Sequence, residues 1–179
     1  MKYETIADIY SANEKAREYL TATVSSISDE EAVALPEGEK WTIQKIVEHL
    51  SMVDFGISRI CAKLIGEAKS TGKFSDGTVN LSPDFLEKLN GIGSVKVEAP
   101  ERVQPTGTIS ITEALVRMHS NRPAIEAMRS DLEKYDLNES KFPHPYFGNI
   151  TAAEWLIVAG GHELRHTAQI ERSLAKLRK

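Results

Sequence analysis

Cysteine is almost absent from this chain of 179 residues, since Cys61 is the only one. A single cysteine excludes an intramolecular disulfide and any metal site built from several thiolates. Long apolar runs are absent too, because no stretch approaches the about 20 apolar residues that a membrane-spanning helix needs. The N-terminal MKYETIADIY mixes polar and apolar residues from the start and does not resemble a signal peptide. We therefore expect a soluble cytoplasmic protein that does not interact with membranes.

Positive charge is not in excess either. Lysine and arginine number 22 against 26 acidic residues, which gives a net charge of -4. A nucleic-acid-binding protein would carry a basic face and a high pI, so this class is excluded. A small anionic ligand held by one or two local arginines is not excluded. The length and the ordinary hydrophobic content of 41% predict a single globular domain over residues 1–179.

Apolar residues at helical spacing predict four long helices. They lie within residues 6–27, 43–64 and 110–132, and from 151 nearly to the C-terminus. Three S/T-x-x-E pairs have capping-box spacing, in which side chain and backbone satisfy each other's unpaired donors: Ser28 with Glu31, Ser110 with Glu113, and Thr151 with Glu154.

Two shorter helices are also predicted. The Ser28 pair indicates a helical turn at residues 29–34, and Ser82-Pro83 opens a short helix that ends near residues 90–91. The long connections, 66–81 and 91–109, contain one strand-like run, SVKVE at residues 94–98, and no set of alternating runs adequate for a sheet. The sequence therefore predicts an all-α fold, an antiparallel four-helix bundle with long crossover loops and short extra helices.

The run HELRH, from His162 to His166, has the H-E-x-x-H pattern of a zinc peptidase helix. Metzincins need a glycine three residues after the second histidine and a third ligand six residues after it. Gln169 and Arg172 occupy those positions. The alternative, a glutamate from a later helix, has no room in the thirteen residues that follow His166 and continue the same helix. We therefore reject the peptidase interpretation.

A third candidate ligand lies upstream. His49 is at the edge of the apolar stripe of the second long helix, and His162 and His166 share the inward face of the last one. Histidines one turn apart have Cβ atoms about 5–6 Å apart, close enough to converge on one ion. Three imidazoles leave coordination positions open, whereas structural zinc sites are closed by four protein ligands. The alternative to a metal site is that the three are ordinary core or surface histidines. If the site exists, imidazole ligands alone do not determine whether it binds Zn²⁺, Ni²⁺ or another divalent metal.

Two stretches resemble the DinB-like family. WTIQKIVEHL is similar to its second-helix signature, and HPYFGNITAAEWLIVAGGHELRHTAQI is similar to its last helix and the loop before it. The resemblance implies a bundle whose metal is held by His49, His162 and His166, and often a homodimer. It also implies that the protein could be a transferase or isomerase that uses a low-molecular-weight thiol, because the family includes such enzymes.

Further residues are candidates for the surroundings of the site. Glu163, at the border of the inward face, is a candidate general base or an interhelical partner. Gln169 is placed to orient a ligand imidazole. Four more could line a substrate pocket: Asn13 and Arg17 in the first helix, Arg122 in the third, and His144 in the FPHPYFG turn. An arginine on an inward face could hold an anionic group, or it could simply reach the end of the bundle or a dimer partner.

The leading hypothesis is a metal-dependent enzyme that activates a thiol or a water towards a small-molecule substrate, as a thiol S-transferase or a hydrolase. The competing hypotheses are a protein that binds metal or a small ligand without turnover, and a metal-free bundle that serves in the stress response. The preference for a transferase rests on the family resemblance alone.

Overall fold

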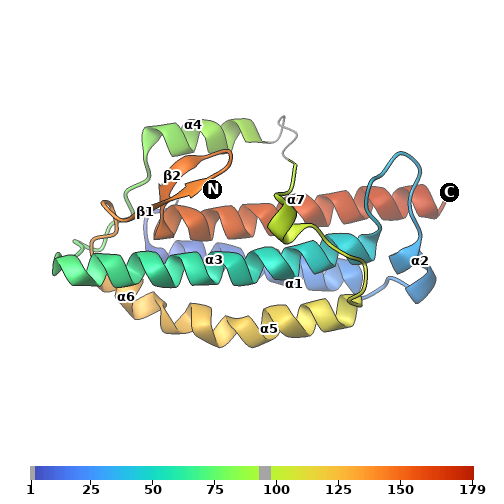
Figure 1. The fold of residues 1–179 in the computed structure, drawn as a ribbon, viewed down its shortest axis with the longest axis horizontal. Coiled ribbons are helices and arrows are strands. Elements are labelled where there is room, and N and C mark those ends of the chain that lie inside the picture. Colours follow the sequence, from blue (N-terminus) through green and yellow to red (C-terminus); the bar gives the residue numbers. More distant parts are fainter. Residues whose placement is uncertain (1–2, 93–97) are drawn as a thin grey trace.

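Four long helices form the body of the structure, a computed structural model that describes residues 3–92 and 98–179 (Figure 1). They are α1 (Ile6–Val24), α3 (Ile43–Thr71), α5 (Ile111–Ala127) and α7 (Ala152–Leu177). Helix α7 packs between α1 and α3, and α3 packs in turn against α5. The predicted four-helix bundle is confirmed. Residues 94–97 of the SVKVE run lie outside the described residues.

The helices run in two directions. Helices α3 and α7 are antiparallel, whereas α3 and α5 run the same way (Figure 1). Helix α1 runs with α7, because Asn13 bonds to Leu156 and Tyr19 bonds further along to Glu171. The bundle thus has antiparallel and parallel neighbours. A parallel pair needs a return crossing, which accounts for the long connection between α3 and α5.

Short elements decorate the bundle. Within residues 3–92 and 98–179 the short helices are α2 (Asp29–Val33), α4 (Pro83–Gly91), the 3₁₀ helix η2 (Glu101–Val103) and α6 (Arg129–Lys134). The sequence predicted α2 and α4, but not η2, and it predicted one helix where α5 and α6 are separate. It also did not predict the antiparallel hairpin of β1 (Lys141–His144) and β2 (Gly148–Thr151), which leads into α7. Its strands are four residues long, too short for an alternating pattern to be visible in the sequence.

Helix starts are fixed locally. Reciprocal capping boxes form at Ser28 and Thr151 as predicted, and a further one forms at Thr5 with an aspartate in the third position. At α5 only half of the predicted box is observed. Ser110 accepts from the Glu113 N–H, but the Glu113 carboxylate bonds to Arg117.

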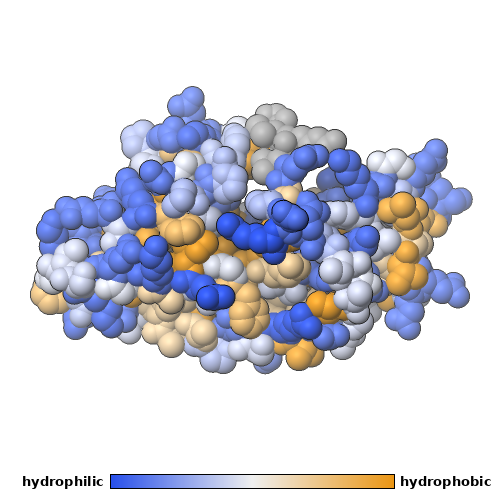
Figure 2. All heavy atoms as spheres, viewed as in Figure 1, coloured by the Kyte–Doolittle hydropathy of each residue, from blue (hydrophilic) through white to orange (hydrophobic). Residues whose placement is uncertain are grey.

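The buried apolar residues form two clusters, one on each side of a central polar layer. In α3, residues 43–50 belong to one cluster and residues 57–65 to the other. In α7 the corresponding segments are 152–158 and 170–174. Hydrophilic residues cover most of the face shown in Figure 2, with apolar residues visible between them. The central stretch of each helix is therefore where polar side chains enter the bundle.

Candidate metal centre

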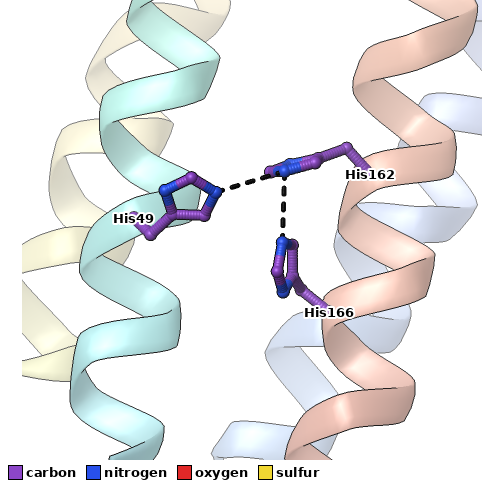
Figure 3. Close-up of side chains that lie close together, drawn as sticks. All are labelled: His49, His162 and His166. Atoms are coloured by element: carbon purple, nitrogen blue, oxygen red, sulfur yellow. Dashed lines mark hydrogen bonds between the residues drawn. The ribbon is translucent and has the colours of Figure 1, made fainter. Parts of the chain in front are cut away.

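Three histidines converge between α3 and α7, at the level of the polar layer (Figure 3). The Nε2 atom of His162 lies 3.2 Å from that of His49 and 3.1 Å from that of His166. His162 and His166 are one helical turn apart, so they project from the same side of α7. Helix α3 packs against that side and brings in His49.

The outer nitrogens of two of these rings have fixed partners. The Nδ1 of His49 lies 2.7 Å from the backbone oxygen of Val103, and the Nδ1 of His166 lies 2.8 Å from the Oε1 of Gln169. Both oxygens can only accept, so each Nδ1 donates its hydrogen. The sequence predicted that a hydrogen bond with Gln169 orients a ligand imidazole, and the structure contains such a bond, which Gln169 accepts. In a neutral ring, each of these Nε2 atoms then carries a lone pair.

Burial keeps the three rings neutral. It lowers the pKa of His49 and lowers that of His162 far below its ordinary value. The same cause lowers the pKa of His166 to about 4, and the neighbouring His49 adds to the effect. Neutral imidazole is the form that binds metal ions.

An electrostatic conflict arises at His162, because its Nε2 faces the Nε2 atoms of both other rings. Two lone pairs, from His49 and His166, are directed at its Nε2, which carries at most one hydrogen. At least one of the two contacts therefore has no hydrogen between its nitrogens. A cation placed among the three nitrogens would remove this conflict.

The nitrogen spacing fits a single ion. With metal–nitrogen bonds of about 2.0–2.1 Å, neighbouring ligand nitrogens lie about 2.9 Å apart at 90° and about 3.4 Å apart in a tetrahedron. The two contacts at His162 fall within this range, and all three nitrogens lie within 4.8 Å of one another. The donor set suits a divalent first-row metal.

Glu163 and Arg17 belong to the polar layer that joins all four helices. Arg17 of α1 donates from Nε to both oxygens of Glu163, at 3.2 and 3.1 Å, and from Nη2 to Asp54 of α3 at 2.8 Å. Asn121 of α5 donates to the same aspartate at 2.6 Å. Burial raises the pKa of Glu163, while Arg17 acts in the opposite direction. Glu163 is thus an interhelical partner, and its role as a general base stays a prediction.

The other predicted pocket residues have different places. Asn13 donates to the backbone oxygen of Leu156, so it joins α1 to α7. The prediction that Arg122 faces inward is wrong, because its exposed side chain pairs with Glu14. The residue before it, Asn121, is the buried one.

His144 lies in β1, where the hairpin turns. Its Nδ1 accepts from the N–H groups of Tyr146 and Phe147. Burial, followed by the charge of Arg102, lowers its pKa to about 4. His144 is near enough to lower the pKa of His162 by its charge. The sequence suggested that His144 lines the pocket of the site, and this stays a prediction.

Several residues around the site gave no clear signal in the sequence. Asp54 and Asn121 are short polar residues within apolar stripes, and that interruption was the only sign available. Glu48 is buried beside His49 and bonds to the loop after η2, a contact that no spacing rule predicts. The Trp41 ring lies 5.0 Å from the His49 ring between centroids, so it covers one side of the cluster.

The comparisons with known proteins agree with this geometry. Residues 12–170 match the DinB superfamily, so the chain belongs to this family, and the predicted resemblance is confirmed. The family is generally metal-binding, and the three histidines could hold the ion.

Two relatives support the assignment. The protein described as uncharacterized protein YuaE of Bacillus subtilis (strain 168) is 23% identical over 155 residues, which cover 86% of this chain and 90% of that one. The crystal structure of TT2238, described as a four-helix bundle protein, superposes with a TM-score of 0.61 and 19% identity, covering 94% of this chain and 99% of that one. At this identity the likeness shows the fold alone.

Among the described residues, no helix is long and apolar enough to span a membrane.

Proposed function

We propose that this protein binds one divalent metal ion through His49, His162 and His166. One observation carries the proposal: the Nε2 atoms of His49 and His166 both direct a lone pair at the Nε2 of His162. Neutral rings, nitrogen spacing and fixed Nδ1 partners all support it. We expect Zn²⁺ or Ni²⁺, because imidazole suits both.

We further propose that the protein is an enzyme that acts on a small molecule. Three protein ligands are fewer than the four that close a structural zinc site, which leaves positions for other molecules. A divalent ion bound there would supply Lewis acidity, which lowers the pKa of a thiol or a water. The protein's own part is to fix the rings: Val103 holds His49, and Gln169 holds His166.

Two reactions are compatible with such a site. In the first, a low-molecular-weight thiol forms an S–C bond at an electrophilic carbon, the bond to the leaving group breaks, and the thiol proton passes to solvent. In the second, water forms the new O–C bond and the leaving group departs with a proton. The preference for the first, thiol S-transfer, comes from the family.

A second candidate is a metal-binding or small-ligand-binding protein without turnover, such as a stress-response bundle. One observation favours it: Arg17 binds both carboxylate oxygens of Glu163, which is the candidate general base that the sequence offered. Both oxygens are then already engaged by the guanidinium, which leaves them less accessible to a proton of a substrate or of a bound water.

Activity measurements separate the two candidates. Metal-loaded protein would be assayed with glutathione or cysteine and 1-chloro-2,4-dinitrobenzene, beside His49→Ala and the exposed control His119→Ala. An enzyme predicts conjugation above the uncatalysed rate, at least tenfold lower in His49→Ala and unchanged in His119→Ala, with circular dichroism unaltered. A panel of ester and amide substrates tests hydrolysis in the same way. No turnover in either assay would favour the binding protein.

The family resemblance also leads us to propose a homodimer. An apolar outer face on α1 would support this, but Tyr19 is the only large hydrophobic residue exposed by more than about a third among the described residues of that helix. Analytical ultracentrifugation tests the proposal, and a sedimentation coefficient of a 19.9 kDa monomer would contradict it.

A further inference from the structure

Glu48 is a buried carboxylate next to a predicted metal ligand, and it does not face the metal centre. Its side chain belongs to a residue that is 2% exposed, and both of its oxygens accept hydrogen bonds from one loop. Oε1 accepts from the Thr106 hydroxyl at 2.7 Å, and Oε2 accepts from the Gly107 N–H at 2.6 Å. We call residues 101–108, which include η2, the strap.

The strap is fastened to α3 at neighbouring points. Gln44, one turn before Glu48, donates to the backbone oxygen of Gly107 at 2.7 Å. Gly107 has a φ of +82°, and a Cβ at this position would lie 2.9 Å from the Cε of Lys45. The backbone conformation therefore favours glycine, and the Lys45 side chain packs closely against it. This turn of α3 is shaped to receive that segment of the strap.

The other end of the strap contacts the metal centre. The Val103 carbonyl accepts the hydrogen bond from His49 Nδ1 at 2.7 Å, and Val103 lies shortly before Thr106 and Gly107, which Glu48 holds. Helix η2 packs against α3. Because a carbonyl can only accept, this contact places the hydrogen of His49 on Nδ1 and leaves Nε2 free to bind metal.

We propose that Glu48 is a positioning residue for the metal centre, acting through the strap on the tautomer and orientation of His49. The inference rests on the proposed metal site. Loss of Glu48 frees residues 106–107, the strap moves, and the Val103 carbonyl no longer holds the ring. His49 then samples both tautomers and several orientations, and the affinity for metal falls.

The matched control is Glu154. It is also a buried carboxylate, 1% exposed, and it also accepts backbone N–H groups, from Ser82 and Thr151. Its partners start two helices and do not contact the three histidines. Glu154→Gln thus disturbs the same kind of bond at a distance from the metal centre.

The experiment measures Zn²⁺ affinity by competition with a chromophoric chelator, and the absorption spectrum of the Co²⁺-loaded protein. Outer partners of metal ligands are typically worth about 10–100-fold in affinity. We expect about tenfold weaker binding in Glu48→Gln, a larger loss in Glu48→Ala, and a shifted Co²⁺ spectrum in both. The Gln variant keeps one acceptor, so it should be the milder change. Glu154→Gln should bind as tightly as the wild type, with an unchanged spectrum.

A second readout needs no metal. Long-range ¹H–¹⁵N NMR of the histidine rings reports which nitrogen carries the hydrogen. The wild type should show His49 protonated at Nδ1, and Glu48→Gln should show a mixture of the two tautomers. This measurement also separates positioning from a general loss of stability, which would leave the tautomer of the folded protein unchanged.

Three outcomes would overturn the inference. Wild-type affinity and spectrum in Glu48→Gln would show that the strap does not need Glu48. Equal losses in Glu48→Gln and Glu154→Gln, in proportion to stability, would show an effect on the fold alone. A wild type that binds neither Zn²⁺ nor Co²⁺ would refute the proposed function, and the inference with it.

Discussion

The Nε2 atoms of His49 and His162 lie 3.2 Å apart, although 113 positions separate the two residues in the sequence. This contact depends on the packing of α3 against α7. It lies in the polar layer of the bundle, between two apolar clusters that fix the helices on either side. The apolar clusters thus provide the rigid frame that holds the three imidazoles in one place.

The ion pairs of the polar layer, in which Arg17 binds Asp54 and Glu163, should contribute strongly to stability. Arg17→Met would leave the buried carboxylates of Asp54 and Glu163 without their cation, and breaking a buried pair in this way costs about 3–5 kcal/mol. Arg122→Met is the control, because its pair with Glu14 is exposed and such pairs contribute about 0–1 kcal/mol. Urea unfolding measures both, and equal costs would contradict the layer's role.

Two adjacent glycines of α7 should respond in opposite ways to alanine. A Cβ at Gly160 would lie 2.2 Å from the Oδ1 of Asn13, whereas a Cβ at Gly161 meets nothing within 4 Å. Gly160→Ala forces Asn13 away from Leu156 and should destabilise the protein by about 1–3 kcal/mol. Gly161→Ala should stabilise it by about 0.5–1 kcal/mol, because alanine favours helix.

Thermal unfolding tests this pair of variants. If Gly160 is required only for the close approach of Asn13, then adding Asn13→Ala to Gly160→Ala should recover part of the loss. A Gly160→Ala variant as stable as Gly161→Ala would show that α1 and α7 do not approach this closely.

His144 should make the metal-free protein less stable in acid. Its folded pKa, lowered to about 4 by burial and then by Arg102, is below the about 6.5 of an unfolded histidine. The unfolded chain therefore binds the proton first as the pH falls. The stability that His144 contributes is complete above about pH 6.5 and is lost towards pH 4. Its share of the slope is below about 1.4 kcal/mol per pH unit, because the ring is partly exposed. The lowered pKa values of His49, His162 and His166 add to the slope of the whole protein.

Urea unfolding of the metal-free protein from pH 7 to pH 4.5 checks this dependence. His144→Asn keeps an acceptor for the two N–H groups but cannot take up a proton, so its slope should be smaller than that of the wild type. The exposed His119→Asn is the control for removal of a histidine. An unchanged slope in His144→Asn would contradict the assignment.

Much of the fold could be predicted because its signals are local. The long helices follow from apolar residues at helical spacing, and Thr151 and Ser28 form the capping boxes that the sequence indicated. The hairpin before α7 was missed because four-residue strands, one containing Pro143, carry no clear alternation. The parallel pairs were missed because helix direction depends on how the crossing chain returns, which spacing does not specify.

The site could be predicted only in part. Two histidines one turn apart on an inward face are visible in the sequence, and His49 followed from a second inward face. Arg122 was misplaced by one residue, because α5 has few buried positions and its inward face is poorly defined. Glu48 could not be found, because the strap that buries it comes from a loop about 58 residues further along the chain.

The most direct test of the account is the metal content of protein purified without an affinity tag, measured by elemental analysis beside His49→Ala. The account predicts about one divalent ion per chain in the wild type and little in the variant, with both folded. No metal in the wild type, and none taken up from Zn²⁺ or Ni²⁺, would contradict it. Metal retained equally by both proteins would show that His49 is not a ligand.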